Sequence, residues 1–349
     1  MKNKRIERRK YIIITCGVIA TLIVVLVLVL LLDKPKDFRD ETKGTPEPTV
    51  IATEGTADGA TPTPMTMDYD SGVYYNGHYY EYNDNLFNMV FLGIDKKDKL
   101  EEHSNPGMGG QADCIILISF DRETKTAKLL QINRDSMVPV DKYDSLGNYM
   151  LTERKQLATQ YAYGNGKEFS AVITKDAVSK LLFGTPIENY FVLDLSAISV
   201  LNDAVGGVTI TMADDYTWLD PAFEKGKTIT FTGQQANEFV HYRNLKELDS
   251  NLGRMQRQIE FIPAMIDQMR KSMGGDTDYY NRFVPLIKDY MVTDLSADRI
   301  NKLAEYNLAE GEIYKVPGNL TMGEKYAEYE VDDAGLQEIL IKMLYKQKK

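Results

Sequence analysis

The stretch GGQADCIILISFDRETKTAKLLQINRD, from Gly109 to Asp135, decides the fold. Two apolar runs, Cys114 to Phe120 and Ala127 to Ile132, flank the charged segment DRETKT, and this pattern predicts a β-hairpin. Both runs are apolar almost throughout, which is typical of central strands that are covered on both faces. We therefore expect this hairpin to lie in the middle of a buried sheet.

Polar residues stand just outside each predicted strand. Asp113 precedes the first strand, and Arg134 and Asp135 follow the second. Because a hairpin returns its two ends to one edge of the sheet, a carboxylate and a guanidinium are expected to meet at that edge. The alternative is that Asp113 is only a turn residue and that Arg134 and Asp135 form a surface pair. The hairpin alone favours neither interpretation.

Strand and helix patterns alternate around this hairpin. The segment FNMVFLGID, which ends at Asp95, is expected to form another short buried strand. Further strands are predicted at 190–193, 208–212 and 313–316, and helices at 153–163, 169–183, 196–205, 233–243, 253–273, 282–290, 297–307 and 333–345. Such alternation predicts an α/β fold in which a mixed central β-sheet is covered by helices on both faces.

The first 85 of the 349 residues divide into three segments. Residues 1–10 are basic, and the uncharged residues 11–32 are long enough to cross a bilayer as a helix. Because basic flanks stay in the cytoplasm, we expect a single-pass signal anchor that places the rest of the chain outside the cell membrane. The apolar run is too long for a cleavable signal peptide.

Residues 33–85 are rich in Pro, Thr, Gly and acids, which predicts a disordered linker. Its last part, YYNGHYYEYNDN, either packs on the following domain as an arm or contacts membrane or glycan. Residues 86–349 are expected to form one extracytoplasmic domain.

The charge and the cysteines exclude some classes of protein. The net charge of the whole chain is −10, and residues 1–10 hold six bases against one acid, so the remainder carries about −15. Such a surface is unsuited to nucleic acid. Cys16 lies in the predicted anchor, which leaves Cys114 without an internal disulfide partner, and a domain of this size does not need one. The sequence carries no signal for an oligomeric state.

Two predicted helices carry candidate binding residues. Thr232 and Gln235 form a capping box at the start of a helix that reaches Arg243. The buried stripe of the following helix is defined by Met255, Ile259, Ile262, Ile266 and Met269. At about 100° per residue, Arg254 and Gln258 share one flank of this stripe, whereas Arg257 points well away from it. Arg254 and Gln258 are therefore the better candidates for a pocket.

These residue types suit a phosphorylated ligand. Asp95 and Asp113, at the ends of predicted strands, offer the hard oxygen ligands that Mg²⁺ accepts. Planar donor groups for phosphate oxygens are available from Arg134, Arg243, Arg254, Arg257 and Gln258. A divalent cation together with several arginines predicts a pyrophosphate site.

Four segments also carry a family resemblance. LGID, QADCIILISFDRETKTAKLLQINRDSM, LNDAVGGVTI and TGQQANEFVHYR…NLGRMQRQ resemble, in order, the motifs of the LytR-CpsA-Psr family of bacterial cell-envelope phosphotransferases. The resemblance spans Leu86 to Met273, behind one predicted anchor. It implies an enzyme that takes a glycopolymer, such as teichoic acid or a capsular or wall polysaccharide, from a polyprenyl-pyrophosphate carrier. The polymer would be joined to a peptidoglycan hydroxyl through a phosphodiester.

The resemblance also assigns roles to single residues. It implies that Asp95 and Asp113 bind Mg²⁺, and that pyrophosphate is bound by Arg134, Arg243, Arg254, Arg257 and Gln258. The arginines would stabilise the charge that develops as the bond between the two phosphates breaks, with Arg134 and Arg254 as the central catalytic groups. Asp135 is a candidate base for the acceptor hydroxyl; the alternative is that it only holds a neighbouring arginine in place.

The chain departs from the family pattern at four positions. Gln111 and His241 stand where the family usually has arginines, Asn133 replaces a proline, and Asn251 replaces an acid. We interpret these differences as a divergent branch with the same fold and a different glycan or weaker activity. A carrier pyrophosphatase and a non-catalytic envelope-binding or regulatory protein remain as alternative functions. The lipid carrier would need an apolar channel. In a sequence, the residues that line such a channel look the same as ordinary core residues.

Overall fold

The computed structural model describes residues 67–96, 99–103, 105–244 and 250–348. No helix within these ranges is long and apolar enough to cross a membrane. The predicted basic tail 1–10, the predicted anchor 11–32 and the predicted linker as far as residue 66 lie outside the described residues.

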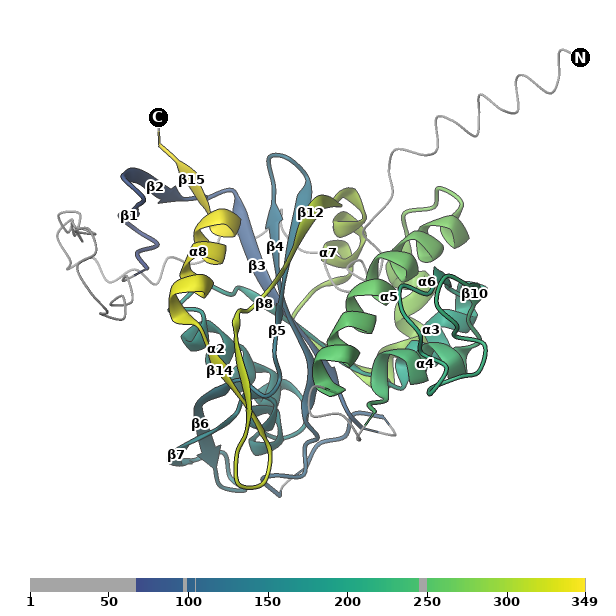
Figure 1. Cartoon of the computed structure of the whole chain (residues 1–349), viewed down its shortest axis with the longest axis horizontal. Helices are drawn as coiled ribbons and strands as arrows, with labels where there is room; N and C mark the ends of the chain where they lie inside the picture. The colour runs from purple at the N-terminus through teal and green to yellow at the C-terminus, as the bar shows by residue number, and fades with distance from the viewer. Residues whose placement is uncertain (1–66, 97–98, 104, 245–249, 349) are drawn as a thin grey trace, which may run out of the picture.

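A six-stranded mixed sheet forms the centre of the domain (Figure 1). In spatial order its strands are β11 (Met291–Thr293), β8 (Asn189–Asp194), β3 (Leu86–Ile94), β4 (Ala112–Asp121), β5 (Thr126–Ile132) and β12 (Asn307–Lys315). The predicted hairpin is confirmed as β4 and β5, which pair Ile115 with Ile132. β3 is antiparallel to β4, whereas β8 runs parallel to β3 and β12 runs parallel to β5.

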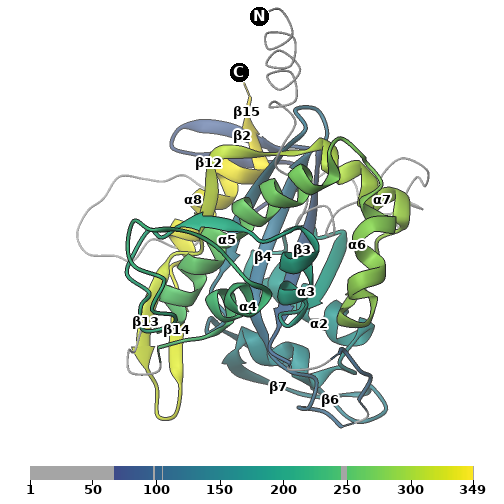
Figure 2. The same ribbon diagram turned by 90° about the vertical axis from the view of Figure 1, so that its right-hand side faces the viewer.

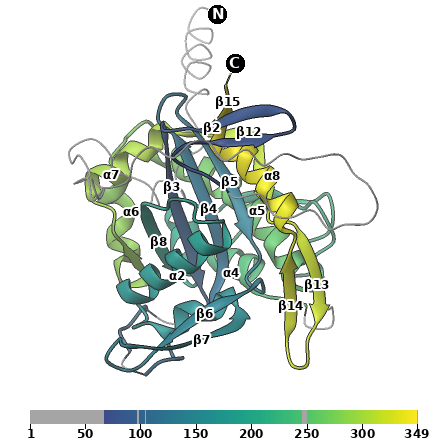
Figure 3. The ribbon, with the colours of Figure 1, turned by 90° about the vertical axis from the view of Figure 1, so that its left-hand side faces the viewer.

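The two faces of the sheet carry separate apolar cores, because successive side chains of a strand point in opposite directions. Phe91 and Ile116 belong to one core, and Val90 and Leu117 belong to the other. The first core is covered by α3 (Ala197–Ala204), α4 (Gly233–His241), α5 (Ser250–Met273) and α6 (Tyr279–Ile287), with α7 (Ala297–Lys302) packed on α6. The second is covered by α2 (Glu168–Leu181), the 3₁₀ helix η1 (Leu157–Tyr163) and α8 (Asp333–Leu344) (Figures 1 and 3). The predicted mixed sheet with helices on both faces is confirmed.

Among the described residues, three two-stranded antiparallel sheets lie outside this sheet. They are β6 (Met137–Tyr143) with β7 (Tyr149–Gln156), β9 (Thr209–Thr211) with β10 (Thr228–Thr230), and β13 (Gly318–Met322) with β14 (Ala327–Val331). The helix predicted at 153–163 is wrong in its first half, because residues 149–156 form strand β7. Leu157 and Tyr161 are buried at helical spacing, which produced the helical pattern, but pairing with β6 keeps the preceding residues extended.

Other boundaries also differ from the predictions. The helix predicted at 282–290 is α6 followed by the short 3₁₀ helix η2 (Lys288–Tyr290), and the helix predicted at 297–307 ends in η3 (Leu303–Glu305). Strand β12 begins at Asn307, six residues before the predicted strand, because it continues along β5 past an irregular stretch between Leu308 and Ile313.

The predicted linker is wrong at its C-terminal end. β1 (Val73–Tyr75) and β2 (His78–Tyr82) form a three-stranded sheet with β15 (Tyr345–Gln347), so the ordered chain begins before Leu86. The Tyr82 ring lies edge-on to Tyr345 at 5.7 Å, and its hydroxyl accepts a hydrogen bond of 2.9 Å from Asn88 Nδ2. Aromatic rings supply enough buried area to order this segment despite its polar composition. Of the two alternatives for the Tyr-rich segment, the packed arm is the one observed.

The sheet topology gathers the ends of four strands at one edge. β3 ends there just before Asp95, and its neighbour β8 ends there at Asp194. β4 begins at the same edge, and β5 ends there shortly before Arg134. We call this place the polar edge and define it by Asp95, Asp113, Arg134, Asp135 and Asp194. Figure 2 shows α4 and α5 in front of the sheet, and α5 begins near this edge.

Candidate active site

Asp113 lies between two arginines from different elements. Its Oδ1 accepts a hydrogen bond from Arg134 Nη1, after β5, and its Oδ2 accepts one from Arg254 Nη1, in the first turns of α5. All three side chains are buried, and Arg254 is only 1% exposed. Burial raises the pKa of Asp113, but the two guanidinium groups together outweigh burial and hold that pKa below its usual range. The expected meeting of carboxylate and guanidinium is confirmed, and the surface-pair alternative is wrong.

Arginines converge on Asp113 in this cluster and further acids flank them, because Asp135 Oδ1 lies 3.4 Å from Arg134 Nε and Asp95 lies beside Asp113. Two guanidinium groups share the one carboxylate of Asp113, and Arg243 adds a further favourable charge interaction with that carboxylate. Arg254 Nε is buried without a hydrogen-bond partner among the described residues. Buried charges without full compensation are costly, so a bound anion would stabilise this arrangement.

The substituted positions of the family pattern are linked to one another and to these arginines. Asn251 Nδ2 donates a hydrogen bond of 2.8 Å to Asn133 Oδ1, and Asn251 Oδ1 accepts one of 2.7 Å from Arg254 Nη2. Gln111 Oε1 accepts a hydrogen bond from Arg134 Nη2. Asn133 and Asn251 therefore form one contact in place of the family's proline and acid. Asn251 and Gln111 each accept a hydrogen bond from an arginine and so orient it.

Asp95 lies beside this cluster. It is half-buried, and its Oδ1 accepts a hydrogen bond of 2.6 Å from the main-chain N–H of Gln111. Burial raises the pKa of Asp95, and the negative charge of Asp113 raises it further. No group of three or more His, Cys, Asp or Glu side chains capable of holding a metal occurs in the described ranges.

The two acids nevertheless fit the predicted Mg²⁺. Mg²⁺ is commonly bound by one or two carboxylates, with water and substrate phosphate completing its ligands. Each oxygen of Asp113 accepts one hydrogen bond from an arginine and keeps a further acceptor direction. A cation between Asp95 and Asp113 would also relieve the repulsion that raises the pKa of Asp95.

Asp194 is a polar-edge residue that the sequence reasoning missed. It is fully buried at the end of β8, and its Oδ1 accepts a hydrogen bond of 2.8 Å from the main-chain N–H of Ser196. Burial raises the pKa of Asp194 to about 6, and its Oδ2 has no hydrogen-bond partner among the described residues. The sequence offered one signal, an acid directly after the strand predicted at 190–193. That strand runs parallel to β3, so the residues that follow the two strands lie at the same edge of the sheet.

Asp135 faces the other side of Arg134. Its Oδ1 lies 3.4 Å from Arg134 Nε and accepts a hydrogen bond of 2.8 Å from Gln156 Nε2. Burial raises the pKa of Asp135, and Arg134 opposes this increase. The pairing with a neighbouring arginine is therefore present, while the role of Asp135 as a base stays a prediction.

Arg257 lies away from Asp113, as its predicted position on the helix indicated. Its Nε donates a hydrogen bond of 2.6 Å to the carbonyl of Phe239, and its Nη2 donates to the carbonyl of Tyr242. Its guanidinium carbon lies 5.7 Å from the ring centre of Tyr216 and 5.3 Å from that of Trp218. Burial lowers the pKa of Arg257 to about 10. Arg257 thus holds the C-terminal end of α4, and none of these contacts is made at the polar edge.

The end of α4 carries His241 and Arg243. The predicted helix 233–243 ends at His241, and the capping box of Thr232 and Gln235 is confirmed. Arg243 follows the helix and acts electrostatically on Asp113 and Asp135. Burial lowers the pKa of His241, so this side chain is neutral at pH 7 and does not replace the positive charge of the family's arginine.

An apolar slot begins beside the polar edge. It lies between the sheet and α3, α4 and α5, and its cavity volume is about 40 Å³ within about 540 Å³ of empty space that includes open solvent. Its lining consists of Phe91, Cys114, Ile116, Ile118, Leu129, Leu195, Ile198, Val240, Gln258, Phe261 and Ile262.

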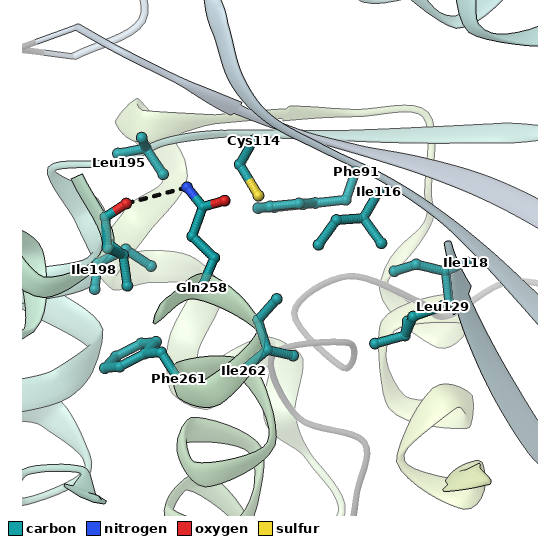
Figure 4. Close-up of a pocket in the computed structure, with 11 residues that line it drawn as sticks. Phe91, Cys114, Ile116, Ile118, Leu129, Leu195, Ile198, Gln258, Phe261 and Ile262 are labelled. Atoms are coloured by element: carbon teal, nitrogen blue, oxygen red, sulfur yellow. Dashed lines mark hydrogen bonds between the residues drawn. The ribbon is translucent and has the colours of Figure 1, made fainter. Parts of the chain in front are cut away.

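Gln258 is the polar group of this slot. Its Nε2 donates a hydrogen bond of 3.1 Å to the carbonyl of Val240, and its buried Oε1 has no partner among the described residues. Figure 4 shows this oxygen on the side of Phe91 and Cys114. The amide therefore fixes the end of α4 with its donor and presents an acceptor to the slot.

Comparison with known proteins defines the class. The sequence profile of the LytR_cpsA_psr family matches residues 56–344, and the chain belongs to this family. Two relatives are named polyisoprenyl-teichoic acid–peptidoglycan teichoic acid transferase. TagU of Bacillus licheniformis is 22% identical over 263 residues, which cover 74% of this chain and 76% of TagU. TagT of Bacillus subtilis is 28% identical over 193 residues, which cover 53% of each chain.

Solved structures share the fold. The crystal structure of B. subtilis TagV superposes with a TM-score of 0.55 at 19% identity and covers 75% of this chain and 96% of TagV. The structure of TagT bound to LIIa-WTA superposes with a TM-score of 0.54 at 22% identity, covering 74% and 90% of the two chains.

The Asp113 cluster predicts a large effect on stability. Asp113→Asn keeps the shape of the side chain but leaves two buried guanidinium groups without their counter-charge, which costs on the order of 3 to 5 kcal/mol. We expect the thermal midpoint of the full chain in mild detergent, followed by near-ultraviolet circular dichroism, to fall by at least roughly 6 °C. As a control, Asp294→Asn alters an exposed acid that accepts a hydrogen bond from Tyr190 N at the other end of β8, and its effect should be smaller. An Asp113→Asn midpoint equal to that of the wild type would contradict the counter-charge role.

The contacts of Arg257 can be followed through Trp218, the one tryptophan in the sequence. Arg257→Lys keeps the charge but loses the planar fork that reaches two carbonyls, so we expect a shifted Trp218 emission maximum and a lower thermal midpoint. Arg254→Lys should leave the emission unchanged, because the contacts of Arg254 are with Asp113 and Asn251. Unaltered Trp218 emission in Arg257→Lys would show that Arg257 does not organise this region.

Proposed function

We propose that this protein transfers a glycopolymer from a polyprenyl-pyrophosphate carrier to a hydroxyl of peptidoglycan, forming a phosphodiester. The observation that carries the proposal is the convergence of Arg134 and Arg254 on Asp113 beside an apolar slot. A pyrophosphate at the polar edge would meet the donor groups of Arg134 and Arg254 while the start of its lipid chain entered the slot. The names of the relatives TagU and TagT support the same substrate class.

In the proposed reaction, the acceptor oxygen attacks the phosphorus that carries the glycopolymer. A new oxygen–phosphorus bond forms, the bond from that phosphorus to the bridging oxygen breaks, and polyprenyl phosphate leaves. Arg134 and Arg254 stabilise the charge that develops on the phosphate oxygens, and their burial strengthens this effect because little water competes. The hydroxyl proton passes to a base, for which Asp135 is the candidate because burial raises its pKa.

Mg²⁺ would be held by Asp95 and Asp113 and would supply further neutralisation of phosphate charge. Gln258 would position the end of α4, and Arg243 would add charge at the mouth of the site. Arg257 would act as a positioning residue for Arg243 through its hydrogen bond to Tyr242. The predicted anchor would keep the domain at the outer face of the cell membrane, where the lipid-linked substrate lies.

Transfer can be tested with a synthetic polyprenyl-pyrophosphate glycan and peptidoglycan fragments. Losing one contact to the phosphates commonly costs about 2 to 4 kcal/mol in the transition state, so Arg134→Ala and Arg254→Ala should each lower transfer roughly 30- to 1000-fold. Gln111→Arg should leave the rate equal or higher, because it restores a cation of the family pattern. Arg122→Ala, in the exposed turn at the other end of the same hairpin, is the matched control and should be neutral.

The products distinguish the alternative functions. Release of polyprenyl phosphate without attachment to the acceptor would identify a carrier pyrophosphatase. Binding of the carrier without turnover, or an Arg134→Ala variant as active as the wild type, would instead identify a binding or regulatory protein.

Mg²⁺ binding has a readout independent of turnover. Asp95→Asn should weaken Mg²⁺ binding at least tenfold, as measured by titration calorimetry of the full chain in detergent, and should lower transfer in parallel. Because protons compete with the cation for Asp95, whose pKa is raised, the affinity of the wild type should fall as the pH decreases toward that pKa. Asp294→Asn is the control. Full transfer by wild-type protein in excess chelator would remove the metal from the proposal.

A further inference from the structure

Exposed apolar side chains are concentrated on two hairpins. In the part of the chain that the structure describes, Leu146, Met322 and Tyr326 are the most exposed on these hairpins, at 84%, 64% and 66%. Together with their exposed neighbours they form a group that we call the apolar rim: Leu146, Tyr149, Met150 and Leu151 on β6–β7, and Met322 and Tyr326 on β13–β14.

Both hairpins lie at the same end of the molecule. Figures 1 to 3, which share one vertical axis, place β6–β7 and β13–β14 at the lower end and β1, β2 and β15 at the upper end. The topology explains this position. β6 follows the polar edge directly after Asp135, and β13 follows β12, which ends at the same side of the sheet because it runs parallel to β5.

The hairpins are also tied to the polar edge by the main chain. Tyr329 N donates a hydrogen bond of 2.9 Å to the carbonyl of Asp135, and Ser136 pairs with Tyr329 as an isolated bridge. Arg154 of β7 forms an ion pair with Glu330 of β14. The rim is therefore held in a defined position relative to Arg134.

Folding does not require apolar residues at these positions. Single exposed apolar side chains are ordinary, but a group of six on neighbouring hairpins is typical of a surface that meets an apolar partner. Between residues 141 and 156 three acids balance three bases, and between residues 318 and 331 three acids stand against one base, so attraction to anionic lipid does not provide the driving force. Leu and Met offer no hydrogen bonds and no flat ring for a sugar, whereas Leu, Met and Tyr together suit the boundary between lipid chains and headgroups.

The chain between the predicted anchor and the domain allows this contact. The described chain begins at Met67, and the carbonyl of the next residue, Asp68, accepts a hydrogen bond of 2.9 Å from the Tyr345 hydroxyl of β15 at the upper end; the predicted anchor ends at Leu32. If the intervening stretch of about 34 residues forms the predicted flexible linker, a chain of this length would reach roughly 30 Å on average and over 100 Å when extended. The domain can therefore turn its lower end toward the bilayer.

We propose that the apolar rim inserts into the outer surface of the lipid bilayer and places the polar edge and the apolar slot beside it. This inference rests on the proposed function for one of its consequences. Insertion of the rim would let a lipid-linked pyrophosphate reach Arg134 and Arg254 without leaving the membrane. The occupant of the rim is lipid, and no protein or glycan partner is needed.

Insertion can be measured with single tryptophans. In a Trp218→Phe background, the full chain is reconstituted in phosphatidylglycerol vesicles with or without brominated acyl chains, which quench nearby indoles. Met150→Trp and Met322→Trp on the rim should each lose at least half of their emission in brominated vesicles. The matched controls Tyr74→Trp and Leu286→Trp, at exposed apolar positions away from the rim, should lose less than a tenth.

Two results would overturn the proposal. One is an absence of quenching at positions 150 and 322, or equal quenching at all four positions. The other is an emission change at 150 and 322 caused by soluble peptidoglycan fragments without any quenching by brominated lipid, which would assign the rim to glycan binding.

A transfer assay separates this proposal from the proposed function. The double variant Met150→Ser/Met322→Ser should lower transfer from a long-chain carrier in vesicles at least tenfold and transfer from a water-soluble short-chain carrier less than twofold. The double variant Tyr74→Ser/Leu286→Ser should change neither rate. Wild-type protein that transfers from neither carrier but shows the expected quenching would refute the proposed function while the docking surface stands. Equal loss from both carriers would contradict a role of the rim in substrate access.

Discussion

The carboxylate of Asp113 is the interaction on which the site depends, because it allows two arginines to be buried within reach of each other. Arg134 comes from the end of a central strand and Arg254 from the start of a long helix, so the ion pairs also fix α5 against the sheet. Without this charge the two guanidinium groups would repel each other in a region with little water. The same arrangement brings the donor groups of two arginines together, as the proposed anionic ligand would require. A contact that holds the fold together would thus also prepare the site for the proposed phosphate.

Much of the fold and of the candidate site could be predicted from the sequence, for reasons that differ between residues. The strand pair at 114–132 was predictable because both runs are apolar, and the position of Asp113 beside Arg134 followed from hairpin geometry. The divergence of Arg254 and Arg257 followed from the helical period. The contact between Asn133 and Asn251 was not predictable, because it joins residues 118 positions apart whose approach depends on how α5 packs. Asp194 was missed because its importance arises from β8 lying next to β3, an order that no local pattern encodes.

The remaining errors have a common origin. Strand β7, the start of β12 and the strands β1 and β2 are stabilised by partners distant in sequence, and their own residues give weak or misleading local signals. The hydrogen-bond donors of Arg257 and Gln258 illustrate the same limit for side chains. Both residues match the family motif. Arg257 Nε and Nη2 and Gln258 Nε2 nevertheless donate hydrogen bonds to main-chain carbonyls near the end of α4. The family motif therefore identifies residues around the candidate site. It does not tell a residue that would contact a ligand from one that supports α4.

The pairing of β2 with β15 has a consequence for how the protein is made. Tyr80 near the start of the domain lies opposite Gln347, almost at the end of the chain. During synthesis, β2 is made long before β15 and lacks that partner strand until residues 345–347 follow. Contacts this distant in sequence close late, because the loop between them must be ordered first. One edge of β2 would therefore remain available to chaperones or to neighbouring chains until β15 has been made.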